Sequence, residues 1–246
     1  MKTRAIVTGH SRGLGEAIAA QLLDKNVDVL GISRKKSSRL AGRDGATLTQ
    51  IEADLGDPKV LADRALSDRI EAFVSGADQV LLINNAGVVK PIGPLGTNGA
   101  AEIVLAVTLN VAAPLAMADL FAAVAAPVKD RRVLHISSGA GRRGMAGWSV
   151  YCATKAALDN HARAVKEDAI KGLRISSLAP GVIDTDMQAE IRSSSIEKFP
   201  AIDHFKAMKA DGVLATPEET ARKLVAHLIS DSFGDEPVTD LRSLTE

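Results

Sequence analysis

The sequence predicts an α/β fold, a doubly wound parallel sheet of about seven strands with helices on both faces. Short apolar or β-branched runs alternate with stretches of helical periodicity, and turns that contain glycine follow several of these runs. The chain has 246 residues, of which 46% are hydrophobic and 24% charged. This composition fits one domain over residues 1–246 with a single core.

The first apolar run, residues 5–7, leads into a glycine-rich segment and then into apolar residues at helical spacing. Gly9, Gly13 and Gly15 give the spacing G-x-x-x-G-x-G. Backbone N–H groups of such a loop, with the positive end of the following helix, can hold a pyrophosphate. The alternative is a tight turn with no ligand. His10 is expected on the surface of this loop.

The second run, residues 27–32, is followed by a basic turn at residues 33–36. Ser33 stands where an enzyme for NAD usually places an acidic residue. Arg34, together with Arg12 of the glycine loop, can bind a 2′-phosphate. The turn therefore favours NADP, although a solvated basic turn is the other interpretation.

Three further elements complete the first half of the chain. Residues 47–53 alternate as in a third strand, and residues 58–74 are expected to form a helix. The run at residues 80–83 is continuously apolar, which is typical of a parallel strand buried on both faces. It ends at Asn84, Asn85, Ala86 and Gly87.

Residues 100–128 are apolar, but Glu102, Asn110, Pro114 and Asp119 interrupt them and much of their bulk is alanine. We expect two closely packed helices here and no membrane span. Proline has no N–H, so a helix through Asn110 and Pro114 would leave the Asn110 carbonyl without its usual donor. That carbonyl could hold a water; a simple kink is the alternative.

The segment from Ser138 to Lys155 indicates an active site. The strand-like run 133–136 precedes Ser138, and Tyr151 and Lys155, four residues apart, should share one helix face. An ammonium group at ~4 Å could lower the tyrosine pKa by roughly three units. The alternative for this pair alone is a surface contact without chemistry.

The last third of the chain contains a strand, a long connection and a helix. Residues 173–178 read as a strand, and the weakly periodic region at about 186–214 is interpreted as a lid over the substrate. Thr216 is a helix N-cap with Pro217 in the first turn and Glu219 completing a capping box. A short strand near Val238 is expected to close the sheet.

Charge and cysteine content exclude several classes of function. The 30 basic and 30 acidic residues cancel, so neither nucleic acid nor a membrane surface is an expected partner. Cys152 is the only cysteine, which rules out an intrachain disulfide or a cysteine-based metal cluster, and we expect no metal. The absence of an apolar leader and the single cysteine fit the cytoplasm.

Taken together, these motifs resemble the short-chain dehydrogenase/reductase family across nearly the whole chain. Residues 148–155 and 184–188 are most similar to the branch that contains sepiapterin reductases and bacterial benzil reductases. The resemblance implies a Rossmann-type fold and reduction of a ketone or vicinal dicarbonyl by NADPH. Its motifs are Thr8, Gly9, Gly13, Gly15, Asn84, Asn85, Ala86, Gly87, Asn110, Ser138, Tyr151, Lys155, Pro180 and Gly181.

The resemblance also implies roles for four catalytic residues. Tyr151 would protonate the carbonyl oxygen, Ser138 would orient it, and Lys155 would lower the Tyr151 pKa and bind the nicotinamide ribose. Asn110 would hold a relay water. Two alternatives remain at this stage, namely an NAD-dependent alcohol dehydrogenase of the same family and a non-catalytic dinucleotide-sensing regulator.

The implied cofactor and substrate contacts extend over the chain. Trp148, Met145 and Met187 are candidates for an apolar substrate wall or, equally, for core packing, and Asp240 is a possible counterpart of a pterin-binding aspartate. Cys152 is interpreted as small packing. We expect a homodimer or homotetramer through helices around 110–128 and 149–171. The residues expected to contact NADP(H) are Gly9, Ser11, Arg12, Gly13, Leu14, Gly15, Ser33, Arg34, Asp54, Leu55, Asn84, Ala86, Gly87, Tyr151, Lys155, Pro180, Gly181, Ile183 and Thr185.

Overall fold

A computed structural model describes residues 1–244 and contains a seven-stranded sheet in which all paired strands are parallel. The strand order is β3-β2-β1-β4-β5-β6-β7, which confirms the predicted fold class. The strands are β1 (Thr3–Thr8), β2 (Asp28–Ser33), β3 (Leu48–Glu52), β4 (Gln79–Asn84), β5 (Asp130–Ile136), β6 (Leu173–Ala179) and β7 (Val238–Asp240). The helices are α1 (Gly13–Leu23), α2 (Pro58–Leu61), α3 (Arg64–Val74), α4 (Ala100–Val107), α5 (Ala113–Val124), α6 (Ser149–Glu167), α7 (Asp186–Arg192), α8 (Ile202–Ala210) and α9 (Pro217–Ile229).

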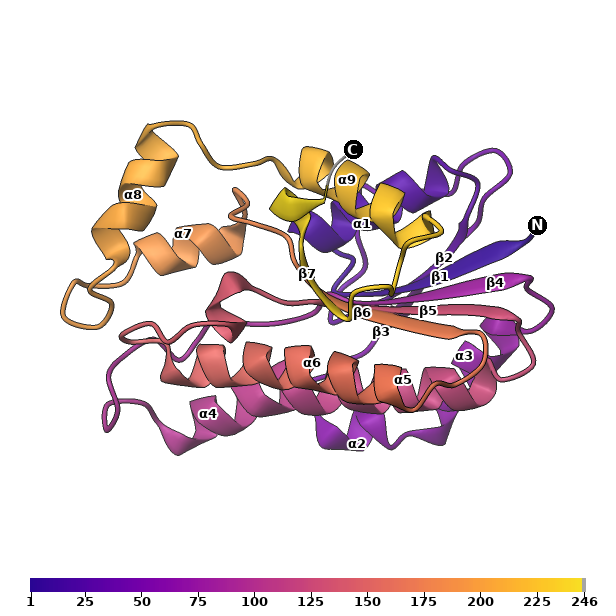
Figure 1. The fold of residues 1–246 in the computed structure, drawn as a ribbon, viewed down its shortest axis with the longest axis horizontal. Helices are drawn as coiled ribbons and strands as arrows, with labels where there is room; N and C mark the ends of the chain where they lie inside the picture. The colour runs from indigo at the N-terminus through magenta and orange to yellow at the C-terminus, as the bar shows by residue number, and fades with distance from the viewer. Residues whose placement is uncertain (245–246) are drawn as a thin grey trace.

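Helices cover both faces of the sheet, because successive strand residues point to opposite sides. In β1, Ala5 and Val7 lie in one core cluster with α1 and α9, whereas Ile6 lies in a second cluster with α3, α5 and α6. Figure 1 shows α1 and α9 on one side of the sheet and α3, α5 and α6 on the other. Both faces are therefore dry, which explains why the strand sequences are almost continuously apolar.

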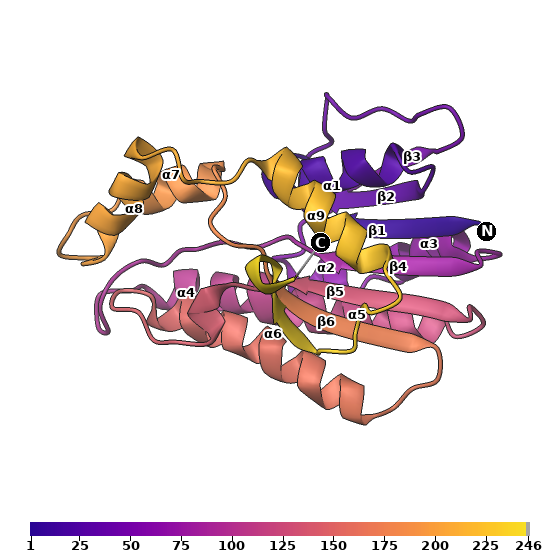
Figure 2. The same ribbon diagram turned by 45° about the horizontal axis from the view of Figure 1, so that its top comes forward.

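The order of the strands reverses direction between β1 and β4. From β1 the chain builds outward through β2 to β3, then returns to place β4 on the other side of β1. Figure 2 shows this succession from β3 to β6 across the sheet. In such sheets a ligand crevice opens beyond the carboxyl ends of the strands where the order reverses.

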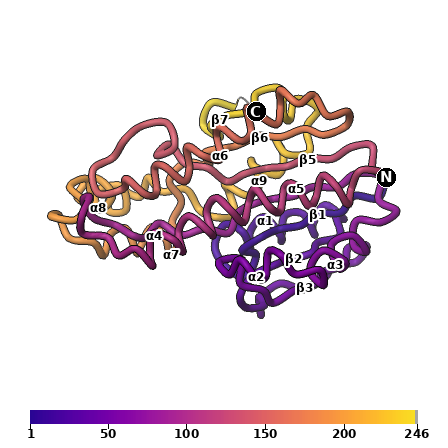
Figure 3. The backbone as a smooth tube through the Cα atoms, turned by 90° about the horizontal axis from the view of Figure 1, so that it is seen from below, coloured from indigo at the N-terminus to yellow at the C-terminus, as the bar shows by residue number. Residues whose placement is uncertain are grey.

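Residues Ala100–Val124 form one continuous helix that includes α4, a π-helical turn at Thr108–Ala112 and α5. The Ala113 N–H donates to the Thr108 carbonyl five residues back, so the wider turn ends just before Pro114. Figure 3 shows this helix alongside α6. An 18-residue window of this 25-residue helix has a mean hydropathy of 1.9. The helix is thus long and apolar enough to span a membrane by length and composition alone, which is weak evidence for a span.

Several boundaries differ from the expectation. The helix expected over residues 58–74 is two helices, because Asp57 and Asp63 each cap a new start by accepting from the backbone two residues ahead. The region 186–214, named here the lid segment, contains the helices α7 and α8 and extends beyond the carboxyl ends of the strands (Figure 1). The Thr216 cap of α9 is confirmed, since its hydroxyl accepts from the Glu219 N–H at 3.1 Å.

Candidate active site

The glycine loop after β1 fits a pyrophosphate. Gly9 and Gly13 have φ angles of +70° and +56°, which side-chain residues rarely adopt. A Cβ atom at Gly15 would overlap the Gly9 carbonyl oxygen, so the loop folds tightly over the start of α1. Helix α1 begins at Gly13 without a side-chain cap, and its first N–H groups therefore suit an anion.

The side chains of Thr8 and Asn85, which belong to the predicted motifs but were assigned no role, fix this loop against β4. The Thr8 hydroxyl accepts from the N–H groups of Asn85 and Ala86, each at 3.0 Å, and the Asn85 amide donates to the Thr8 carbonyl at 3.0 Å. These bonds join the carboxyl ends of β1 and β4. They hold the loop at the position where the strand order reverses.

His10 is not on the loop surface, so that expectation was wrong. Its side chain is fully buried, with Nε2 2.7 Å from Gln50 Oε1 and Nδ1 3.1 Å from Ser33 Oγ. The ring fills the space beside Gly31, where a Cβ atom would overlap it. The missing side chain at position 31 was the one sequence signal for a buried ring.

The residues expected at the adenosine end lie on the β2 side of the loop. Ser33 is the last residue of β2 and is buried, whereas Arg34 is exposed next to it. Arg12 is also exposed, and its guanidinium forms an ion pair with Asp186 of α7 at 2.9 Å. Arg12 therefore connects the glycine loop to the lid segment in this arrangement.

The other residues expected to contact the cofactor differ in the exposure of their side chains. The Leu55 side chain is 3% exposed in the core, and Asn84 is equally buried, donating to the Pro114 carbonyl at 3.1 Å. Asp54 is exposed and accepts from the Gly56 N–H. Thr185, which begins α7, lies over the loop, because a Cβ atom at Gly13 would be 3.5 Å from its methyl carbon.

Tyr151 and Lys155 lie in the first turns of α6, at the end of the sheet where a ligand crevice is expected. Both are buried, at 8% and 6% exposed, and the Lys155 ammonium lies 5.7 Å from the centre of the Tyr151 ring. Its Nζ donates to the Ile136 carbonyl at 2.8 Å. The i, i+4 spacing thus gives the shared face that was expected.

The pKa of Tyr151 departs from the expectation. Burial raises it to about 12, and a hydrogen bond from Ser138 opposes this only in part. Burial also lowers the pKa of Lys155 to about 8, against the charge of Asp159. The expected net lowering of the tyrosine pKa was wrong, because burial has the larger effect.

Ser138 joins Tyr151 from the loop that follows β5. Its hydroxyl oxygen accepts from the Ala140 N–H at 3.2 Å as it caps the short helix at Gly139–Gly141. The hydroxyl proton remains available to donate towards Tyr151 or a ligand oxygen. Ser138 and Tyr151 thus present two O–H donors at one point.

Asn110 lies behind Lys155 in the π-helical turn. Its amide oxygen accepts from the Val88 N–H at 2.9 Å, and its nitrogen donates to the Val88 carbonyl at 2.8 Å. A Cβ atom at Gly87 would be 3.1 Å from the Asn110 oxygen and 3.8 Å from Lys155 Nζ. The glycine therefore leaves space between the two side chains.

Asp159 is a site residue that the sequence reasoning missed. It is 1% exposed and accepts hydrogen bonds at 2.7 Å from the hydroxyls of both Ser137 and Ser177. It follows Tyr151 and Lys155 at the same four-residue interval, so the spacing 151, 155, 159 was the signal that could have found it. Its charge favours the protonated form of Lys155.

The rings of Trp148, Phe199 and Phe205 form an aromatic cluster together with Tyr151. The Trp148 ring meets Tyr151 edge-on at 5.2 Å and stacks on Phe199 at 4.5 Å. Met145, Met187 and Cys152 are partly buried against the same cluster, which agrees with the packing role expected of Cys152. The aromatic rings of the lid segment were not predicted.

Two buried donors in this region lack an acceptor among residues 1–244. They are the indole nitrogen of Trp148, which is 4% exposed, and the amide nitrogen of Gln188, which is 3% exposed. Buried polar groups are normally paired, so each is a candidate to bind a polar ligand atom. Gln188 keeps its amide oxygen on Arg192 at 3.0 Å.

Asp240 already has partners in the structure. Its carboxylate accepts from Arg242 at 2.7 Å and lies 3.7 Å from Arg142, and these cations lower its pKa.

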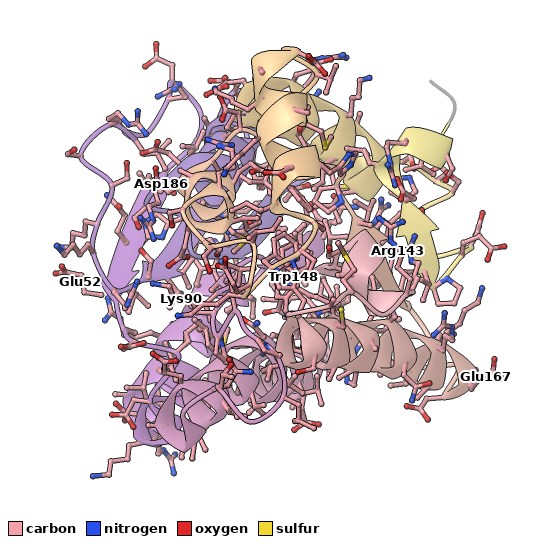
Figure 4. The ribbon with its side chains drawn as sticks, turned by 90° about the vertical axis from the view of Figure 1, so that its left-hand side faces the viewer. Glu52, Lys90, Arg143, Trp148, Glu167 and Asp186 are labelled. Carbon is pink, nitrogen blue, oxygen red and sulfur yellow. The ribbon has the colours of Figure 1, made fainter. Side chains whose placement is uncertain are left out.

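Figure 4 looks onto the carboxyl ends of the strands, with Glu52 and Asp186 on one side, Trp148 in the middle and Arg143 on the other side. In the described part of the chain, no group of His, Cys, Asp and Glu could hold a metal.

Comparison with known proteins identifies the family. The sequence profile described as short chain dehydrogenase matches residues 3–195. The chain belongs to this family. Its members use nicotinamide dinucleotides, and the glycine cradle at Gly9, Gly13 and Gly15 fits such a cofactor.

Curated relatives confirm the branch. The benzil reductase ((S)-benzoin forming) of Bacillus cereus is 34% identical, with 93% of this chain and 94% of the relative covered. The same enzyme of Bacillus subtilis is 36% identical over 91% of this chain and 92% of its own. Sepiapterin reductase of Meriones unguiculatus is 32% identical over 93% and 92%.

Solved structures agree with this family. A short-chain dehydrogenase/reductase from Burkholderia vietnamiensis is 45% identical, covers 99% of this chain and 100% of its own, and has a TM-score of 0.67. A short chain dehydrogenase from Burkholderia cenocepacia in complex with NADP is 27% identical, covers 96% and 94%, and has a TM-score of 0.76. The chain is therefore an oxidoreductase of this family with relatives that are carbonyl reductases.

Proposed function

We propose that this protein is an NADPH-dependent reductase that acts on a ketone or a vicinal dicarbonyl. The carrying observation is the convergence of Ser138 and Tyr151 O–H donors above a buried Lys155. When bound, the reduced nicotinamide supplies a hydride to the carbonyl carbon. Every other requirement falls to residues of the chain.

Tyr151 is proposed to be the general acid. With a pKa of about 12 its phenol keeps its proton at neutral pH, so it can donate that proton as the carbonyl oxygen gains negative charge. The Ser138 hydroxyl donates a hydrogen bond to the same oxygen and stabilises that charge. The cation of Lys155 lies behind both and stabilises the phenolate that remains.

Asn110 is proposed to help restore the proton. The space that Gly87 leaves between Asn110 and Lys155 would suit a water linking them. Pro114, four residues after Asn110, has no N–H to occupy the Asn110 carbonyl. Both features support a relay by which Lys155 regains a proton.

Preference for NADPH is supported by the end of β2. Ser33 and Arg34 replace the acid that would bind the ribose of NAD, and Arg34 is exposed for a phosphate. The relative from Burkholderia cenocepacia was solved with NADP. Arg12 would reach the same phosphate only by leaving Asp186.

The proposed substrate is an aromatic or apolar compound with two neighbouring carbonyl groups. The aromatic cluster offers faces for a ring, and the Trp148 and Gln188 nitrogens offer donors for a second oxygen. The relatives named benzil reductase act on such a compound. With Asp240 held by arginines, we favour a diketone over a pterin.

We also propose a cytoplasmic homo-oligomer formed through the long helix and α6. Val104, Leu105 and Val107 on α4 are 63%, 49% and 43% exposed, a group of large apolar side chains on one helix. Sedimentation should show a dimer or tetramer, and Val104→Asp should shift it towards monomer. Val213→Asp, which places the same charge on a valine that is 60% exposed outside these helices, is the matched control.

The function is tested by following NADPH oxidation, with NADH in parallel, against aromatic diketones, aliphatic diketones and sepiapterin. We expect turnover of an aromatic diketone with NADPH that Tyr151→Phe lacks. A preference for NADH would instead support the NAD-dependent dehydrogenase. NADPH binding without turnover of any of these compounds would support a regulator.

A further inference from the structure

We propose that His10 is a positioning residue for the 2′-phosphate of NADPH and acts through the hydroxyl group of Ser33. This inference rests on the proposed function, because it requires the cofactor phosphate to lie at the end of β2.

The His10 ring is held in one place beneath β2. It is fully buried, and Gly31 in the middle of β2 leaves the space that the ring occupies. The backbone also joins the two segments, since the Gly9 N–H donates to the Ile32 carbonyl at 2.8 Å. The ring therefore lies between the glycine loop and the strand that ends at Ser33.

Gln50 of β3 decides which ring nitrogen carries a proton. Its amide oxygen accepts from the Ser37 N–H at 2.8 Å, and its amide nitrogen donates to the Ser37 carbonyl at 3.3 Å. These two bonds fix the orientation of the amide. His10 Nε2, 2.7 Å from the same oxygen, must then donate to it.

The other nitrogen of the neutral ring is consequently an acceptor that faces Ser33. The Ser33 Oγ atom lies 3.1 Å from His10 Nδ1 and 2.6 Å from the Lys35 carbonyl. Its single proton has these two acceptors, one in the core and one in the basic turn. Both hold Oγ at the end of β2, beside Arg34.

His10 thereby fixes both ends of the basic turn. It holds Ser33 directly and Ser37 through Gln50. A phosphate at this turn would meet the Arg34 guanidinium on a loop that cannot move freely, which reduces the entropy lost on binding. The pyrophosphate loop is also held by bonds that do not involve this ring, from the Asn85 amide to the Thr8 carbonyl and from the Ala86 N–H to the Thr8 hydroxyl.

A purely structural role for the ring makes a different prediction. If His10 only fills space, its loss should weaken NADPH and NADH alike, since both share the pyrophosphate loop. If it positions Ser33, its loss should affect NADPH alone. The ratio of the two cofactors distinguishes these roles.

We would measure KM and kcat with both cofactors for the intact protein, His10→Ala, Ser33→Ala and the double variant. His10→Ala should raise KM for NADPH about five- to tenfold, the effect of losing one ordinary hydrogen bond. KM for NADH and both kcat values should stay within about twofold. The double variant should be no worse than Ser33→Ala, because both changes remove one interaction.

His227→Ala, which removes a partly buried imidazole in α9, is the control. It should leave the preference for NADPH over NADH unchanged. If His10→Ala does not fold, Gln50→Met can be used, since it keeps the His10 ring but removes the acceptor of its Nε2–H. This variant should lower the preference for NADPH over NADH in the same way. Equal weakening of both cofactors, or additive effects of His10 and Ser33, would overturn the inference. An intact protein that prefers NADH would overturn the proposed cofactor and this inference with it.

Discussion

The two halves of the candidate site are held in place by different interactions. On the β1 to β3 side, buried hydrogen bonds from Thr8, Asn85, His10 and Gln50 hold the loops. On the α6 side, the Tyr151 phenol is covered by aromatic packing from Trp148 and the lid segment. Directional bonds fix one geometry, whereas apolar packing is non-directional and tolerates exchange of one ring for another.

The attachment of the lid segment strengthens this contrast. Asp186 of α7 pairs with Arg12, and Glu190 pairs with Lys90 at 2.8 Å. The Arg12 and Lys90 side chains are 67% and 62% exposed, so these pairs contribute little to stability. Exposed ion pairs thus attach the lid segment, whereas hydrogen bonds between Thr8 and Asn85 hold the glycine loop.

The largest effect is expected where the two halves meet, at Tyr151. Tyr151→Phe keeps the ring that packs on Trp148 but removes the proton donor, so kcat should fall by ~10³-fold. NADPH binding, measured by fluorescence, should be unchanged. A variant that retains a tenth of the activity would show that the acid lies elsewhere.

On the cofactor side, Arg34 should matter more than Arg12. Arg34→Leu removes an exposed cation beside Ser33, and the preference for NADPH over NADH should fall by about 30-fold. Arg12→Leu should cost less, because Arg12 is shared with Asp186. The ratio of kcat/KM for the two cofactors measures both, and equal losses would show that Arg12 leaves Asp186 for the phosphate.

The seam between the halves should respond to pH through His135 of β5. Burial, with His161 and Lys155 nearby, lowers the pKa of this fully buried ring to about 3. The unfolded chain binds a proton below pH ~6.5 and the folded chain does not, so stability is complete above that pH and is lost as pH falls. Between pH 7 and pH 5 the loss should be on the order of 2 kcal/mol.

Urea unfolding at the two pH values measures this loss. Asp130, whose pKa of about 2 lies far below this window, should not contribute. His135→Asn, which cannot titrate, should flatten the dependence. A dependence equally steep in that variant would assign it to other groups, such as His161 and His227, whose pKa values burial also lowers.

The smallest effect should appear on the substrate side. Trp148→Phe keeps an aromatic face but removes the buried indole N–H, so kcat/KM for a diketone should fall about fivefold. A monoketone of similar size, which lacks the second oxygen, should be unaffected and serves as the control. Equal losses for both compounds would mean that the indole contributes only packing.

Local patterns predicted the arrangement of residues well where it depends on spacing along the chain. Tyr151 and Lys155 share a helix face because the helix repeat requires it, and the glycine spacing placed a phosphate cradle after β1. Ser138 and Asn110 were found through the family resemblance. Their positions beside Tyr151 and Lys155 follow from the order of parallel strands.

Long-range contacts were beyond the sequence. His10 was expected on the loop surface, because nothing local shows that Gly31, on the neighbouring strand, leaves room for its ring. Phe199 and Phe205 lie in a weakly periodic region, and only folding brings them against Trp148. The pKa of Tyr151 also depends on burial by these distant residues, which outweighs the nearby lysine.

The α/β class, the glycine loop and the pair Tyr151 and Lys155 could be predicted from local patterns, because each depends on a short periodicity or on a residue's own conformational freedom. The tertiary structure shows which side chains support these elements, since burial and hydrogen bonding join residues such as His10 and Gln50 that are far apart in the chain. It also decided the proton affinities of the site, because they depend on how much water the fold excludes.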